Sequence, residues 1–200
     1  MKRAGVKVIS PITVVIDTAE QQPFSFAEIK GDAKEEYRLI HVPVIWKSLG
    51  RHPNSLGDYS LLGYEGQCNV ERKSMSDAHG TILGWDGDRD VRDVSRRERF
   101  ENELANLAGI ESALVVVECS LETLLTSAPC WGKKSSAVNA KILHRSIVAY
   151  MQDYQVPWLF AGSRRLAEIT TYRFLARFHR KRIEGMKERR KAAIEGMEVV

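Results

Sequence analysis

Cysteine and long apolar segments are scarce in this sequence. Its 200 residues include three cysteines, Cys68, Cys119 and Cys130, an odd number without the spacing of metal ligands. Two of them lie within apolar, strand-like runs, where cysteine serves as a small hydrophobic side chain. This pattern argues against a disulfide framework and a zinc site, and it indicates a reducing compartment.

No run approaches the roughly 18 consecutive apolar residues that a membrane span requires. The N-terminal stretch MKRAGVKVISPITVVID begins with basic residues, but Ser10 and Pro11 interrupt its apolar part and Asp17 ends it, without a small-residue cleavage site. We therefore expect no signal peptide, no membrane partner and a cytoplasmic protein that is not secreted. Internal repeats and long linkers are also absent, so the length favours one domain around one core.

The net charge of +4 is unevenly distributed along the chain. Between Arg164 and Lys191 there are 11 Lys or Arg and three Glu, a local charge of +8 that leaves −4 for the rest. An acidic body with a basic C-terminal segment suggests a polyanionic partner. Most charge runs are merely solvated helix faces, and that alternative stays open here.

The hydrophobic pattern predicts an α/β fold. Extended segments are expected at 12–18, 36–46, 58–73 as a hairpin, 112–120 and 156–162, and helices around 100–107, after Ser135 or Ser136, and from Ser163. This order predicts a mixed central sheet flanked by helices, with an antiparallel hairpin portion and a parallel portion. Pro43 predicts an edge or a bend, and segment 112–120 is expected to be central.

Four tryptophans divide into two pairs. Trp46 and Trp158 lie in apolar strands and are expected in the core, whereas Trp85 and Trp131 lie in polar, Gly-containing loops. A loop indole either packs beneath its loop or stacks on a nucleic-acid base, and the sequence does not decide between them. In the last helix, Leu166, Ile169, Phe174 and Phe178 recur as apolar positions, and the two phenylalanines are expected in the core or in a dimer seam.

The segment CNVERKSMSD, 68–77, places three charges within a strand that otherwise has a buried pattern. Because strand side chains alternate, Glu71 and Lys73 are expected on one face and Arg72 on the other. Asp58 precedes the partner strand of the same hairpin, and Asp17 ends the first strand, so both carboxylates are expected near Glu71.

Converging carboxylates raise one another's pKa unless a cation compensates. Oxygen ligands without His or Cys suit Mg²⁺ or Mn²⁺, and a lysine beside such a metal orients or deprotonates water and stabilises charge on a phosphate. Asp58, Glu71, Lys73 and Asp17 therefore predict a metal-dependent phosphodiesterase site. A Glu-x-Lys pair alone is more often a surface salt bridge, so the neighbouring acids carry this prediction.

The stretch GDYSLLGYEGQCNVERKSMSD resembles the signature of the XPF family of structure-specific DNA endonucleases, whose nuclease domain has the PD-(D/E)xK fold. The resemblance implies a restriction-endonuclease-like mixed central sheet flanked by helices. The family pattern, G-D-[YF], a short hairpin and E-R-K-x-x-x-D, is matched by Gly57, Asp58, Tyr59, Glu71, Arg72, Lys73 and Asp77. Asp17 and Glu20 match D-x-x-E at the end of the family's first strand. More loosely, Arg99 and Phe100 match a helix motif in which Glu103 replaces the usual Gln, and Glu118 matches an acid that ends a later strand.

The resemblance implies that Asp58 and Glu71 bind Mg²⁺ or Mn²⁺, that Asp17 adds a further acidic ligand, and that Lys73 positions the attacking water. Glu20, Arg72 and Asp77 would support the site, with Arg72 pairing with an acid or a phosphate. The resemblance covers a nuclease domain over 12–180. A basic helical tail over 181–200 follows it, without a helix-hairpin-helix module. Backbone contacts to DNA are expected from Arg99, Arg180, Lys181, Arg182, Arg189 and Arg190. Because the family pairs through its last helices, a homodimer through the C-terminal helices is also expected.

Together these patterns predict a DNA-associated, metal-dependent endonuclease acting on flaps, forks or junctions. Two alternatives remain: a catalytically silent subunit that binds DNA and dimerises, and a nuclease without structure preference. The intact acids favour activity. An insertion over 84–96 is either a lid or a plain loop, and His79 is expected to be a solvent-facing loop residue rather than a general base.

Overall fold

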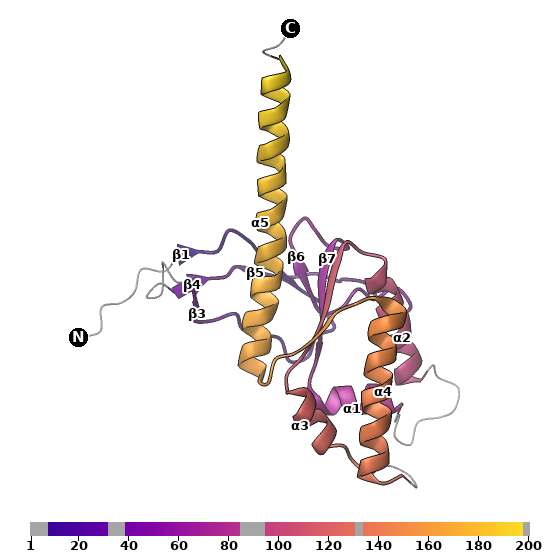
Figure 1. The fold of residues 1–200 in the computed structure, drawn as a ribbon. Helices are drawn as coiled ribbons and strands as arrows, with labels where there is room; N and C mark the ends of the chain where they lie inside the picture. The colour runs from indigo at the N-terminus through magenta and orange to yellow at the C-terminus, as the bar shows by residue number, and fades with distance from the viewer. Residues whose placement is uncertain (1–7, 32–38, 85–94, 131–133, 198–200) are drawn as a thin grey trace, which may run out of the picture.

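The computed structural model describes residues 8–31, 39–84, 95–130 and 134–197. They form a six-stranded central sheet with helices on both faces and a small three-stranded sheet beside it (Figure 1). The predicted mixed α/β architecture is thus confirmed. Trp85, Trp131 and most of the predicted insertion lie outside the described residues.

The central sheet combines antiparallel and parallel pairing. In spatial order its strands are β5 (Val44–Trp46), β2 (Val14–Ile16), β6 (Tyr59–Leu61), β7 (Cys68–Lys73), β8 (Ser112–Val117) and β9 (Trp158–Phe160). Strands β6 and β7 form the predicted hairpin, and β7, β8 and β9 run parallel. Strand β2 pairs antiparallel with β6 and parallel with β5. The two-part sheet expected from the sequence is therefore present.

The segment expected as one strand over 36–46 divides at Val42 and Pro43. Strand β4 (Leu39–His41) joins β1 (Val8–Ile9) and β3 (Ile29–Lys30) in the small sheet, whereas β5 becomes an edge of the large one. Proline lacks the N–H that would continue a ladder, which explains the division. The expectation that Trp46 is a core residue was wrong: its side chain is 53% exposed because it lies on the edge strand.

Every helix of the described chain begins at a serine cap. The helices are α1 (Met75–Leu83), α2 (Arg96–Ala108), α3 (Leu121–Thr126), α4 (Ser136–Tyr154) and α5 (Arg164–Met197). In each, the serine before the first residue accepts a hydrogen bond at Oγ from the backbone N–H three residues on. The predicted cap at Ser135 is confirmed.

Two hydrophobic cores lie on opposite faces of the central sheet. Along β8, Leu114 and Val116 belong to the core beneath α5, whereas Val115 and Val117 belong to the core beneath α1, α2 and α4. Figure 1 shows α5 on one side of the strands and α1–α4 on the other. Trp158 lies in the second core, as expected. Strand alternation thus fixes which face each neighbouring side chain serves.

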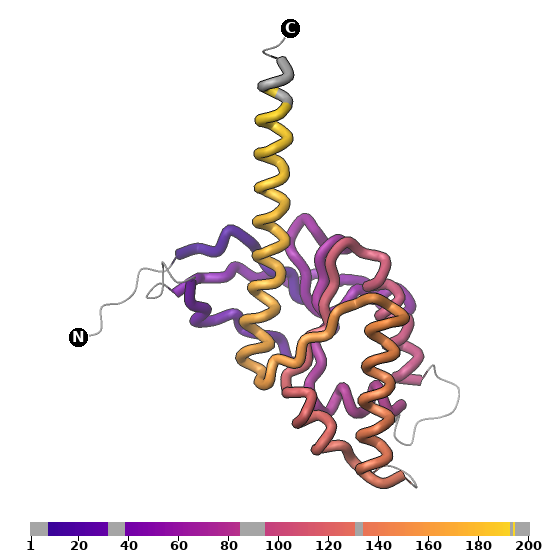
Figure 2. The backbone as a smooth tube through the Cα atoms, viewed as in Figure 1, coloured from indigo at the N-terminus to yellow at the C-terminus, as the bar shows by residue number. Residues whose placement is uncertain are grey.

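Helix α5 is much longer than the sheet that it crosses. Ala167, Thr171, Leu175 and Phe178 are buried against the sheet, but Leu166, expected on the apolar face, is 52% exposed. The helix passes position 180 without a break, and its last part extends away from the body of the molecule (Figure 2). The basic tail predicted from 181 onward is therefore the continuation of a core helix.

Gly57 offers a stability test, because it adopts a left-handed φ of 82° directly before Asp58. A Cβ added there would lie 3.0 Å from the Val70 carbonyl oxygen, whereas one added at Gly63, with φ 83°, would meet nothing within 4 Å. We expect Gly63→Ala to lower the free energy of unfolding by about 1 kcal/mol, and Gly57→Ala by at least about 1 kcal/mol more. Urea denaturation measures both, and equal losses would contradict the close approach.

Candidate active site

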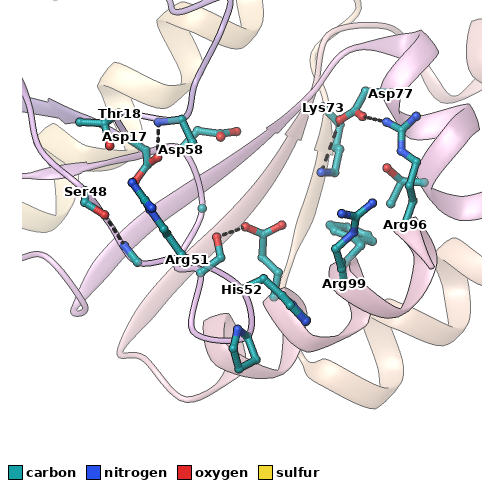
Figure 3. Close-up of a pocket in the computed structure, with 18 residues that line it drawn as sticks. Asp17, Thr18, Ser48, Arg51, His52, Asp58, Lys73, Asp77, Arg96 and Arg99 are labelled. Carbon is teal, nitrogen blue, oxygen red and sulfur yellow. Dashed lines mark hydrogen bonds and ion pairs between the residues drawn. The ribbon is translucent and has the colours of Figure 1, made fainter. Parts of the chain in front are cut away.

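The predicted acids meet at one edge of the central sheet. Asp17 follows β2, Asp58 precedes β6, and Lys73 ends β7, so antiparallel pairing brings these strand ends together. The backbone N–H of Asp17 donates to the carbonyl of Asp58 at 2.8 Å, and the N–H of Asp58 donates to that of Val70 at 3.0 Å. A pocket of about 500 Å³ opens at this edge, lined by Asp17, Asp58, Lys73 and, from α1, Asp77 (Figure 3).

Tyr59 anchors the loop that borders this pocket. Its ring is fully buried and stacks on Phe24 with centroids 5.1 Å apart. Its hydroxyl oxygen accepts a hydrogen bond from the Phe24 N–H at 2.9 Å. The Gly-Asp-Tyr motif therefore has three physical parts: a close backbone approach at Gly57, a carboxylate at the site, and an aromatic anchor beneath it.

Glu71 and Lys73 lie on one face of strand β7 and Arg72 lies on the other, as the period of two predicts. Lys73 contacts the Glu71 carboxylate on one face. On the other face Arg72 donates from Nε to Glu118 at 2.7 Å and from Nη1 to Glu20 at 3.2 Å. All three triplet side chains are buried, so each face carries its own ion pairs within the protein.

Asp58 and Glu71 form a carboxyl pair that is costly to ionise. Burial raises the pKa of Asp58 to about 7; Lys73 opposes this shift, and Glu103 and Glu20 add to it. Burial also raises the pKa of Glu71 well above its usual range, and the nearby Asp58 and Glu103 reinforce the shift. In the described structure, the buried Oε2 of Glu71 has no hydrogen-bond partner. A further cation at this pair would offset both costs.

Lys73 is held as an ammonium ion. Burial alone lowers its pKa, but Glu71, Asp77, Glu103 and Asp58 together raise the pKa well above its usual value. Its Nζ lies 3.4 Å from the Asp77 carboxylate and 4.5 Å from the centre of the Phe100 ring. A lysine that keeps its proton donates hydrogen bonds. Of the two roles predicted from the sequence, orienting water and deprotonating it, this environment favours the first.

The donor set suits a divalent metal ion in part. Within the described ranges no group of three or more His, Cys, Asp or Glu side chains is placed to hold one. Asp58 and Glu71 nevertheless offer hard oxygen donors, one of them without a hydrogen bond, and phosphate and water oxygens commonly complete magnesium sites of this kind. The oxygen donors of Asp58 and Glu71 are therefore compatible with Mg²⁺ or Mn²⁺, and their role as metal ligands stays a prediction.

Asp17 has a clear structural role. One carboxylate oxygen accepts the Ala19 N–H at 2.6 Å, and the other accepts the Leu49 N–H, so Asp17 joins the ends of β2 and β5. Its function as a further metal ligand stays a prediction.

Arg72 and its acids form a buried cluster behind the pocket. Glu118 also accepts from Arg164, the first residue of α5, at 2.6 Å, and both arginines lie over the ring of Phe24. Arg72 was expected to pair with an acid or with a phosphate. In the structure it pairs with two acids, Glu20 and Glu118. Glu20 pairs with Arg72 within this cluster, and its supporting role in catalysis stays a prediction.

Asp77 binds Arg96 at 2.7 Å and thereby links α1 to the start of α2. The arginine packs over Gly80, where an added Cβ would lie 2.9 Å from its guanidinium. The position of Arg96 was not predicted, because no periodicity in the sequence distinguishes it from its basic neighbours. Both Arg96 and the predicted DNA-contact residue Arg99 line the pocket.

Glu103 is a further carboxylate at the pocket, beside Asp17, Asp58 and Asp77, and the sequence pattern assigned it no role. It accepts a hydrogen bond from Ser55 Oγ at 2.7 Å, and it lines the pocket together with Arg51 and His52 of the same loop. Asn106 donates to the carbonyls of Pro53 and Ser55, which fixes this loop to α2. The signal that was available is the acid that replaces the family's usual Gln.

His79 was wrongly expected to face solvent from a loop. It lies in α1, is 5% exposed, and its Nε2 lies 2.8 Å from the Leu124 carbonyl oxygen. The sequence pattern after Ser74 does not distinguish a short helix from irregular structure, so the buried face of α1 was not predicted.

The other residues predicted to contact DNA lie on α5, at the opposite edge of the sheet. Arg180, Lys181, Arg189 and Arg190 are exposed there. Arg182 instead pairs with Glu111 and donates to Gln67 at 3.1 Å, beside the first residues of β7 and β8. The structure therefore separates the basic tail from Asp58 and Lys73 by the length of the sheet.

Comparison with known proteins connects this fold to a class of solved structures. No family model and no curated protein matches the chain. Among solved structures, XPF from Aeropyrum pernix aligns over 92% of this chain and 73% of that one, with 20% identity and a TM-score of 0.49. XPF from Aeropyrum pernix in complex with DNA aligns over 85% and 66%, with 19% identity and a TM-score of 0.50. The chain thus has an XPF-like fold, consistent with the restriction-endonuclease-like sheet expected from the sequence.

Stability should depend on pH through Asp58. Its pKa is about 7 in the folded protein and 3.8 ordinarily, so the folded state binds the proton more tightly. Without metal, the free energy of unfolding should therefore fall as pH rises from about 4 to 7. Asp58→Asn should flatten this fall, and magnesium should stabilise the wild type most above pH 7. Urea denaturation in EDTA at pH 5 and 8 tests this; parallel profiles would contradict it.

Removing Arg72 should destabilise the protein more than removing Arg164. Arg72 is 8% exposed, and its loss leaves Glu20 without its cation in a buried site, so Arg72→Ala should cost about 3 kcal/mol. Arg164, 43% exposed, shares Glu118, and Arg164→Ala should cost about 1 kcal/mol or less. Thermal and urea unfolding compare the two variants. A smaller loss for Arg72→Ala would mean that its pairing does not stabilise the sheet.

Proposed function

We propose that this protein is a metal-dependent endonuclease that hydrolyses phosphodiester bonds in DNA. The observation that carries the proposal is the carboxyl pair Asp58 and Glu71 beside the charged Lys73. Asp58 and Lys73 line the open pocket, and Glu71 is buried against Lys73 with one oxygen that has no hydrogen bond in the described structure. Structural ion pairs alone do not call for two carboxyl groups with raised pKa values at a pocket edge, whereas catalytic sites commonly contain them.

The proposed roles follow from the protonation states. Asp58 and Glu71 would hold Mg²⁺ or Mn²⁺, with Asp17 as a further ligand; a bound divalent ion lowers the pKa of water and neutralises charge on a phosphate. Lys73, as an ammonium donor, orients the attacking water or stabilises a phosphate oxygen as negative charge develops. Asp77 and Glu71 keep Lys73 aimed at the pocket.

The rim of the pocket suits a polyanion. Arg51, Arg96 and Arg99 line it beside the carboxylates, so a phosphodiester backbone would meet cations on either side of the reacting group (Figure 3). One structural neighbour is an XPF in complex with DNA, which supports DNA as the substrate class. Retention of all the motif acids favours an active enzyme over a silent DNA-binding subunit.

Preference for flaps, forks or junctions is part of the proposal and rests on the family motif. Such preference requires contacts to the backbone and to DNA shape, not to base edges. A DNA-associated location follows from the same proposal, and a homodimer through the C-terminal helices is its proposed assembly. In the described chain no helix has the length and apolarity to cross a bilayer.

Cleavage assays test the proposal directly. With Mg²⁺ or Mn²⁺, the protein should cut flap, splayed-arm or junction DNA faster than linear duplex, and EDTA should abolish cutting. Asp58→Asn, Glu71→Gln and Lys73→Ala should each lower the rate at least about 100-fold. The matched variants Asp153→Asn and Lys141→Ala, at exposed positions of α4 that do not line the pocket, should cut like the wild type.

Failure to cut any substrate, or equal rates for site and control variants, would overturn the catalytic assignment. Equal rates on branched and linear DNA would leave the nuclease but remove the structural preference.

A further inference from the structure

Helix α5 crosses the central sheet from one end of its strands to the other. The two edges are these two ends of the strands. At its start, Arg164 pairs with Glu118 at the edge that holds the candidate active site. Further along, Arg182 pairs with Glu111 at the edge where β7 and β8 begin. The six residues of β7 separate these edges by about 20 Å, at about 3.3 Å per residue.

A groove of about 470 Å³ lies at this second edge, between α5 and the start of β8. We call it the distal groove. The charged and aromatic residues that line it include Phe174, Arg177, Lys181, Arg182, Arg189 and Glu111. Four cations, one acid and a half-buried aromatic side chain thus line the distal groove.

The charge of the distal groove is not balanced by the protein. Glu111 is paired with Arg182, and within the described part of the chain no carboxylate forms an ion pair with Arg177, Lys181 or Arg189. These three side chains are exposed. Arg177 and Lys181 are four residues apart, and like charges at this spacing disfavour a helix by a few tenths of a kcal/mol. An external polyanion would relieve that repulsion.

The spacing of these cations suits a nucleic-acid backbone. A helix rises about 1.5 Å per residue, so Arg177 and Lys181 are offset by about 6 Å along α5. Two successive phosphate steps along one DNA strand advance about 6.8 Å along the duplex axis, at about 3.4 Å per step. The exposed edge of Phe174 adds an apolar surface beside them, which free inorganic anions would not use.

We propose that the distal groove binds the backbone of a DNA segment that is not being cut, about 20 Å from the candidate active site. The inference rests on the proposed function for its choice of DNA as the polyanion, and it adds a second, separate contact surface to it. Arg177 and Phe174, which the sequence did not assign to DNA, belong to this surface.

Binding without cleavage tests the proposal. A labelled 30-bp duplex in EDTA is titrated by fluorescence anisotropy between 50 and 250 mM NaCl. Arg177→Glu combined with Lys181→Glu should raise the Kd at least about tenfold and make the slope of log K against log salt less negative by about 2. The matched control, Lys134→Glu with Lys141→Glu, makes the same charge change at exposed positions at and just before the start of α4.

If the groove and control variants bind alike while both retain the wild-type melting temperature, the distal groove is not a DNA site. Light scattering after gel filtration examines the rival occupant, a second copy of the chain. A dimer that the groove variant disrupts, with unchanged DNA affinity and salt slope, would also overturn the proposal.

The two proposals fail separately. Loss of binding in the groove variant, in a protein that cuts no DNA, would leave the distal groove and remove the nuclease. Cleavage that depends on Asp58 and Lys73, with unchanged binding in the groove variant, would do the reverse.

Discussion

The burial of three consecutive charges in β7 is the constraint on which the rest of the structure depends. Glu71, Arg72 and Lys73 lie at the end of a strand in the middle of the sheet, and none of them is more than 9% exposed. A buried charge is tolerated only with a partner, and each face of the strand must therefore supply one. The ends of neighbouring strands do so, because pairing in register places their polar residues at the same edge.

The two faces solve this problem differently. Behind the strand, Arg72 is matched by Glu20 and Glu118, and Arg164 reinforces Glu118, so the cluster is neutral and closed. In front, Lys73 faces Glu71, Asp58 and Asp77, and Asp77 also pairs with Arg96. Glu103 adds a further negative charge that raises the pKa values of Asp58 and Glu71. The closed face is suited to holding the fold together, and the unbalanced face is suited to receiving a cation. The segment Glu71-Arg72-Lys73 thus places one structural charge, Arg72, between two that pair with each other on the opposite face of the strand.

Local patterns in the sequence predicted much of this arrangement. Period two separated Arg72 from its neighbours, and hairpin pairing placed Asp58 near Glu71, because both depend only on adjacent residues. Trp46 was misplaced since hydrophobicity does not reveal whether a strand lies at an edge. His79, Glu103 and the loop with Arg51 were missed because their positions depend on contacts between distant segments, such as Ser55 with Glu103. The sequence did not indicate where the basic tail lies relative to the site; the direction of α5 carries it to the opposite ends of the strands.

The attachment of α5 at both edges makes its length a fixed quantity. Arg164 is tied to Glu118 and Arg182 to Glu111, with Leu175 and Phe178 buried between them. Inserting or deleting one residue in this stretch would rotate everything after it by about 100° and displace it by about 1.5 Å. The buried face and the second ion pair could not then be satisfied together. Surface loops carry no such constraint on their length. The number of residues from 164 to 182 is set by the distance between the two ends of the strands that α5 crosses.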